Sequence, residues 1–116
     1  VSKDDGLGGT APTNNREYGG KIINGKVVPV KAGEVGDPSA GKVASIKGAD
    51  DFHSHPSGSV KLKGGTAMWA QPPSNTDIKS AKGTNYVFGM KNGTIYIYTN
   101  KGVVATLPIS TFKKQN

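Results

Sequence analysis

His53 and His55 are the only two histidines of this chain, and one residue separates them. In a β-strand, residues i and i+2 point to the same face, with Cα atoms about 6.5–7 Å apart. Two imidazoles placed in this way can bind one ion, because Zn²⁺ takes histidine nitrogens at about 2.0–2.1 Å. The pair therefore predicts a metal site. The competing interpretation is a hydrogen-bonded or surface pair with no ligand.

The strand that must carry the histidines is predicted at residues 51–55, because Pro56 ends it. Two more short strands are predicted at residues 18–23 and 26–31. Asn24-Gly25 between them favours a type I′ hairpin turn. Glycines 19 and 20 inside the first strand indicate a bulge or a close approach by another backbone or a ligand.

The one clear helix is predicted at residues 75–82. Ser74 is a natural N-cap, Asp77 stands where a capping carboxylate belongs, and Gly83 ends the helix. Residues 56–73 read as a long loop rich in Gly, Lys and Pro, and loops of more than about 12–15 residues are often functional or mobile. Trp69 in this loop is either a core residue or a substrate platform.

The last third of the chain contains three β-rich runs joined by Asn-Gly and Asn-Lys-Gly turns, which predicts an antiparallel meander over residues 86–107. Residues 43–46 are either a weak strand or a short helix. Residues 1–15 offer almost nothing to bury and predict a flexible lead-in to a single domain at residues 16–116. The fold class expected is α+β, with a curved, mostly antiparallel sheet and one or two short helices.

Composition narrows the chemistry. With no cysteine, disulfides, thiolate metal sites and cysteine nucleophiles are excluded.

The net charge of +7 is carried almost wholly by lysine, and Arg16 is the single arginine. Nucleic-acid readers favour arginine for bidentate contacts, so a solvated basic surface is the preferred interpretation. An anionic partner, including nucleic acid, stays open as the alternative. No apolar run approaches the length of a membrane span.

Taken together, the arrangement Glu17 … His53-x-His55-Pro56 … Ser74-x-x-Asp77 resembles the motif of the JAMM (JAB/MPN+) zinc metalloproteases. The His-Pro-Ser-Gly continuation is similar to the RadC-type bacterial branch. The resemblance implies a reduced JAB-like domain with the layered, cytidine-deaminase-like arrangement of that family. It also implies hydrolysis of a peptide or isopeptide bond in a protein or peptide substrate.

The roles that the resemblance implies are specific. His53, His55 and Asp77 would be the Zn²⁺ ligands, Glu17 the general base, and Ser74 the donor to the oxyanion. Such a zinc site acidifies a water, and a carboxylate nearby accepts its proton. Glu34 is the only other glutamate, and it stands in a Gly-rich loop where a solvated carboxylate is expected.

The chain departs from the family pattern in two places. About ten residues usually separate the second histidine from the aspartate, whereas twenty-one do so here. The extra residues fall at 59–73, where they would form a lid or select the substrate. The long helix that the family places before the glutamate strand is not visible in the sequence.

The chain begins with Val, and we expect a processed product or a terminal piece of something longer. JAB-like domains occur as C-terminal toxin modules of large exported bacterial proteins, so the resemblance implies a secreted or delivered effector and an acidic immunity protein that matches the +7 charge. Two other functions stay open. One is a RadC-like DNA-associated protein, and the other is a non-catalytic binding module with the JAB fold.

Overall fold

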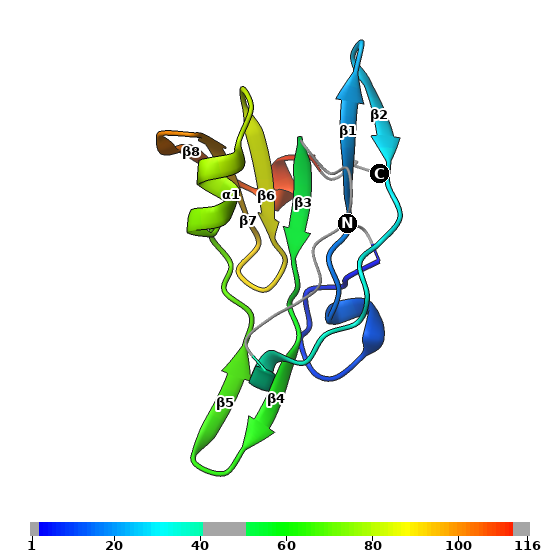
Figure 1. Cartoon of the computed structure of the whole chain (residues 1–116). Coiled ribbons are helices and arrows are strands. Elements are labelled where there is room, and N and C mark those ends of the chain that lie inside the picture. The colour runs from blue at the N-terminus through cyan, green and yellow to red at the C-terminus, as the bar shows by residue number, and fades with distance from the viewer. Residues whose placement is uncertain (1–2, 41–50, 113–116) are drawn as a thin grey trace.

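The computed structural model describes residues 3–40 and 51–112, which form a six-stranded sheet in the order β2-β1-β3-β6-β7-β8 and a separate hairpin, β4–β5 (Figure 1). The strands are β1 (Gly19–Ile23), β2 (Lys26–Pro29), β3 (Phe52–His55), β4 (Ser59–Leu62), β5 (Gly65–Met68), β6 (Asn85–Gly89), β7 (Thr94–Thr99) and β8 (Gly102–Pro108). The described helices are α1 (Asn75–Ser80) and the short 3-10 helices η1 (Pro12–Asn14), η2 (Pro38–Ala40) and η3 (Ile109–Phe112).

Every neighbouring pair in the large sheet is antiparallel except β3–β6. The prediction of an α+β fold with a curved, mostly antiparallel sheet and few short helices is confirmed. The longest described helix has six residues, so the long helix of the family pattern is not found in the described part of the chain. The cytidine-deaminase-like layering stays a prediction.

The β1–β2 hairpin forms as its turn residues predict. Asn24 and Gly25 have φ angles of 51° and 76°, the positive values that a type I′ turn requires. A side chain at Gly20 would place its Cβ 2.5 Å from the carbonyl oxygen of Val28 and 2.8 Å from the ring of Phe52. The close approach predicted for the paired glycines is therefore confirmed at Gly20.

The C-terminal meander is also confirmed, as β6, β7 and β8. Gly93 lies in its first turn and Gly102 begins β8 directly after the second, and both have positive φ. Asn85 lies opposite Tyr98 across the β6–β7 pair, and Val87 lies opposite Tyr96. Because residues directly opposite point to the same face, these four side chains share one face of the sheet.

Helix α1 packs on this face. Ala81 forms a small core with Val87 and Tyr98, and Ile78 and Tyr96 pack against it. The tyrosines of β7, Tyr96 and Tyr98, are thus packing residues of the sheet. The helix ends at Ser80, two residues before the predicted end, and Gly83 with φ +73° leads the chain away from it.

The connection from β3 to β6 corrects a prediction. The segment read as one loop, residues 56–73, contains the β4–β5 hairpin, which turns at Gly64 with φ +92° and projects from the large sheet (Figure 1). Most of its strand residues are exposed. Ser59–Leu62 alternates polar and apolar residues, which is the signal of a strand, but only over the minimum of about four positions, and Gly65–Met68 lacks it. The hairpin is therefore only weakly marked in the sequence.

Residues 3–15 correct a second prediction. This segment was expected to bury almost nothing, yet Asp4, Asn14 and Asn15 are buried in the structure. Asp4 accepts hydrogen bonds from the hydroxyl and the backbone N–H of Ser57 at 2.6 and 2.9 Å. A side chain at Gly58 would collide with Asn15. The segment therefore belongs to the packed domain, through polar contacts that hydropathy does not reveal.

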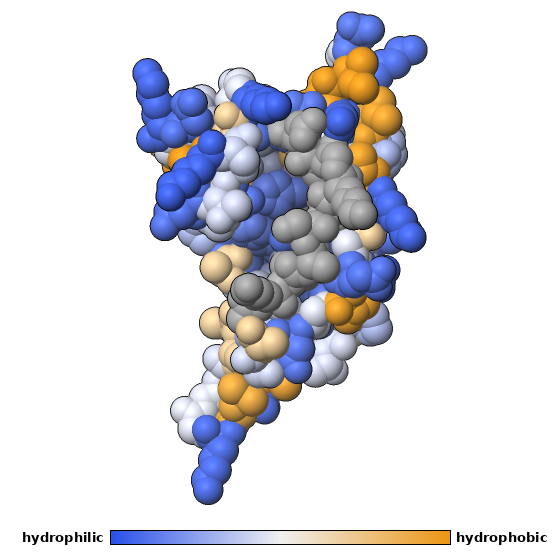
Figure 2. All heavy atoms as spheres, in the orientation of Figure 1, coloured by the Kyte–Doolittle hydropathy of each residue, from blue (hydrophilic) through white to orange (hydrophobic). Residues whose placement is uncertain are grey.

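Apolar side chains remain exposed mainly on the two hairpins and on β8. Figure 2 shows those of the β1–β2 hairpin, which include Ile22, Ile23, Val27 and Val28. In residues 3–40 and 51–112, no helix is long and apolar enough to cross a membrane. The element predicted at residues 43–46 lies outside the described residues.

Candidate metal centre

Strand β3 presents both histidines on the sheet face that α1 covers. His53 and His55 are each 8% exposed, and their ring centroids lie 5.1 Å apart. His53 stands opposite Gly19 of β1, which contributes no side chain to this face. The i, i+2 spacing therefore places both imidazoles on one face of the sheet, as the sequence predicted. Both side chains are buried, so this is not a surface pair.

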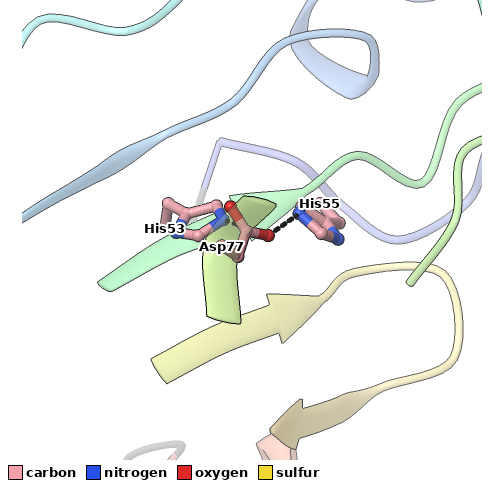
Figure 3. Close-up of side chains that lie close together, drawn as sticks. All are labelled: His53, His55 and Asp77. Atoms are coloured by element: carbon pink, nitrogen blue, oxygen red, sulfur yellow. Dashed lines mark hydrogen bonds and ion pairs between the residues drawn. The ribbon is translucent and has the colours of Figure 1, made fainter. Parts of the chain in front are cut away.

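The third member of the group comes from the first turn of α1. Oδ2 of Asp77 lies 3.3 Å from Nε2 of His53 and 3.3 Å from Nε2 of His55 (Figure 3). One ligand atom from each residue falls within 4.8 Å of the others. Two imidazole nitrogens and one carboxylate oxygen are a donor set that suits Zn²⁺ and other divalent transition metals. The group can therefore hold a metal ion.

A capping box fixes Asp77 in this position. The backbone N–H of Ser74 donates to Oδ2 of Asp77 at 2.9 Å, and the N–H of Asp77 donates to the Ser74 hydroxyl oxygen at 3.0 Å. The predicted cap is confirmed, including its reciprocal bond. One carboxylate oxygen serves both arrangements, because Oδ2 of Asp77 faces the cap and the two histidines.

His55 is oriented by its other ring nitrogen. Nδ1 lies 3.1 Å from the backbone carbonyl oxygen of Gln71. A carbonyl oxygen can only accept, so Nδ1 carries the proton in this hydrogen bond. The bond leaves Nε2 as the nitrogen that faces Asp77 and any bound ion. Gln71 was not identified from the sequence, where it looks like one more polar loop residue.

The charges of the group are strongly coupled. Burial acts to raise the pKa of Asp77, but the hydrogen bonds from His53 and His55 outweigh it and hold that pKa well below its usual range. Burial acts to lower the pKa of His55, and the hydrogen bond and charge of Asp77 outweigh that effect and raise it. Asp77 therefore favours positive charge at His55, which a proton or a bound cation can supply.

Glu17 is buried beside the histidine pair. It precedes β1, and the β1–β3 register of Gly19 with His53 extends to Glu17 opposite His55, so both side chains belong to one face. Burial raises the pKa of Glu17, and the charges of His53 and His55 partly offset this rise. Glu34 is exposed. The structure thus brings together Glu17 and the histidines, as predicted.

Ser54, between the two histidines, secures the segment that carries Glu17 and leads into β1. Its hydroxyl oxygen accepts from the N–H of Tyr18 at 2.9 Å, and its own N–H donates to the Tyr18 carbonyl at 2.7 Å. Ser54 is fully buried. This role of Ser54 was not identified from the sequence, because its partner Tyr18 is 36 residues away and becomes a neighbour only on folding.

Ser74 is exposed at the start of α1, next to Asp77. Its hydroxyl oxygen accepts the capping bond, and its O–H can still donate elsewhere. Its role as an oxyanion donor stays a prediction.

Trp69 is buried, and its indole N–H donates to Oδ1 of Asn15 at 3.0 Å. The core interpretation of Trp69 is confirmed.

Tyr98, a residue of the small core under α1, is also a neighbour of the site. Burial first, and then the negative charge of Asp77, raise the pKa of its hydroxyl to about 12, with a smaller contribution from Glu17. The Tyr98 hydroxyl therefore stays protonated at neutral pH, near both carboxylates. Oδ1 of Asn85, opposite Tyr98 on β6, is buried and finds no hydrogen-bond partner among the described residues.

Comparison with protein-family models found no matching family, and comparisons with curated proteins and with solved structures found no match. The functional conclusion therefore depends on the geometry of the site and on the residues that form it.

Proposed function

We propose that this chain is a zinc-dependent hydrolase of peptide or isopeptide bonds, of the JAMM type. The observation that carries the proposal is the convergence of His53, His55 and Asp77 within 4.8 Å, next to the buried carboxylate of Glu17. Zinc is preferred because two imidazoles and one carboxylate suit it and leave room for a substrate or water. The order of these residues in the chain, with Pro56 after the second histidine, supports the JAMM type.

The work of the protein side chains follows from their positions. Zinc, when bound, supplies Lewis acidity that polarises a carbonyl group and makes water easier to deprotonate. The carboxylate of Glu17 accepts a proton from the attacking water and returns it to the leaving amine. The raised pKa of Glu17 suits this proton transfer near neutral pH. The hydroxyl of Ser74, at the entry to α1, donates to the developing oxyanion.

The setting that we propose is a toxin or effector module of a larger exported bacterial protein, held inactive by an acidic immunity protein. The charge of +7 supports a partner of this kind, because opposite charge accelerates association. Affinity for such a partner is expected to fall as salt is added.

The test of the hydrolase function compares two glutamates. Zinc-loaded protein is incubated with linear peptides and with lysine-linked isopeptides, and mass spectrometry identifies the products. Glu17→Gln should bind zinc and release no product, whereas Glu34→Gln, with the same change on an exposed residue, should cleave as the unaltered protein does. Equal cleavage by Glu17→Gln would remove Glu17 from the reaction, and zinc binding without cleavage of any substrate would favour a binding module.

A further inference from the structure

The side chain of Gln71 connects three segments that surround His55. Its Nε2 donates to the carbonyl oxygens of Pro56 at 3.0 Å and Trp69 at 3.1 Å. Its Oε1 accepts from the backbone N–H of Lys91 at 2.7 Å, with a longer contact of 3.4 Å to that of Asn92. The amide thus links the end of β3, the chain that leaves β5, and the turn between β6 and β7.

The backbone of Gln71 acts on His55 directly, because its carbonyl oxygen accepts from Nδ1–H at 3.1 Å. The carbonyl oxygen of His55 in turn accepts from the N–H of Met90 at 3.1 Å, on the segment that also donates to the Gln71 side chain. The ring and the backbone of His55 are therefore tied to one network. Movement of the Gln71 backbone would release Nδ1–H and free the ring to rotate or to change tautomer.

Two further features hold Gln71 in place. The chain just before Gln71 is anchored by Trp69, whose indole N–H donates to the buried Asn15. Gly89 lies opposite His55 on β6, and a Cβ there would come within 3.1 Å of the Cβ of Gln71. The absence of a side chain at Gly89 makes room for Gln71.

We propose that Gln71 is a positioning residue of the metal centre, which fixes His55 as the Nδ1–H tautomer and so presents Nε2 to the ion. The extra residues 59–73 would then be part of the scaffold of the site and not a movable lid. This inference rests on the proposed zinc site, and it adds a residue that the JAMM-like motif does not contain.

The test uses two variants that change the amide of Gln71 in different ways. Gln71→Met keeps the length of the side chain and removes all of its hydrogen bonds. Gln71→Glu keeps the acceptor for Lys91 N–H but loses the donor to Pro56 and Trp69. Asn92→Ala is the matched control, because the Asn92 side chain bonds Thr94 and Tyr96 of β7 and does not bond Gln71.

Zinc affinity is measured by competition with a chelator, and the Nδ1–H signal of His55 is followed by NMR in the zinc-loaded protein. Loss of an outer hydrogen bond to a metal-binding histidine typically weakens metal affinity about 10–100-fold. We expect this loss in both Gln71 variants, together with rapid exchange of the Nδ1 proton with water. Asn92→Ala should keep both the affinity and the signal.

Three results would overturn the inference. Unchanged zinc affinity with a retained Nδ1–H signal in both variants would show that Gln71 does not position His55. Unfolding of both variants in the absence of metal would assign Gln71 to the stability of the whole domain. Weaker zinc affinity with an intact Nδ1–H signal would place its effect elsewhere. Failure of the unaltered protein to bind zinc would instead reject the proposed function itself.

Discussion

The backbone N–H of Ser74 donates to Oδ2 of Asp77 at 2.9 Å, and that same oxygen lies 3.3 Å from the Nε2 atoms of both histidines. The first turn of α1 therefore places the only carboxylate of the three-residue group. Helix capping and ligand placement are one structural feature, so a change at the cap should affect both stability and the metal centre.

Two substitutions separate the capping role of Ser74 from its proposed role as an oxyanion donor. Ser74→Ala should lower the free energy of unfolding by about 0.5–2 kcal/mol, whereas Ser74→Gly should cost only a few tenths. Both variants lack the hydroxyl, and an oxyanion donor contributes about 10²–10³-fold to turnover. We expect equal losses of turnover in the two variants at saturating zinc. Loss only in Ser74→Ala would show that the hydroxyl serves the cap alone.

Glu17 should reduce the stability of the metal-free fold at neutral pH. Burial raises the pKa of Glu17 above the ordinary 4.5, so its ionisation destabilises the folded state as the pH rises through and above that value. In chelator, Glu17→Gln should therefore melt at a higher temperature than the unaltered protein at pH 7.5, and at the same temperature near pH 4. A lower melting temperature at pH 7.5 would contradict the burial of a costly charge.

The metal-free protein should lose stability as pH rises past neutrality. The raised pKa of His55 stabilises the fold fully below its ordinary 6.5, and this contribution disappears as pH rises through the folded value. The lowered pKa of Asp77 acts in the opposite sense, and its contribution is lost only as pH falls below about 3.8.

Melting temperatures measured in chelator between about pH 6 and pH 8 test this prediction. Asp77→Asn should flatten the curve, because it removes the main cause of the raised His55 pKa. With zinc in excess the trend should reverse, since the ion displaces the proton from the imidazole. A flat curve for the metal-free, unaltered protein would contradict the coupling between His55 and Asp77.

The N-terminal segment should contribute to stability through Asp4. Asp4→Ala leaves the buried N–H and hydroxyl of Ser57 without their acceptor, and an unsatisfied buried group costs about 1–3 kcal/mol. Asp37→Ala, which removes exposed local bonds to Ser39, is the control and should cost much less. Chemical denaturation measures both. Identical midpoints would support a flexible lead-in after all.

The parts of this fold that could be predicted are those with local signals. Asn24-Gly25 specifies a turn that needs positive φ, and Ser74 with Asp77 specifies a helix start, so both were read from a few adjacent residues. The spacing of His53 and His55 fixes a shared face for the same local reason. The site was predictable to the extent that it is built from these short patterns.

The remainder depends on contacts between distant residues. Nothing near β3 indicates that it pairs in parallel with β6, more than thirty residues away along the chain. Several polar residues hydrogen-bond distant parts of the chain, namely Asp4, Asn15 and Gln71. A hydropathy pattern assigns polar residues of this kind to exposed loops. Their partners, Ser57, Trp69 and His55, become neighbours only after folding.

The metal content of the purified domain tests the central claim most directly. Elemental mass spectrometry is applied after zinc loading and dialysis to the unaltered chain, to Glu34→Gln and to Asp77→Ala, with the double variant His53→Ala/His55→Ala as the negative control. We predict about one zinc per chain in the first two proteins and loss of that zinc in both ligand variants. No bound zinc in the unaltered chain, or zinc retained in the double variant, would contradict the proposed metal centre.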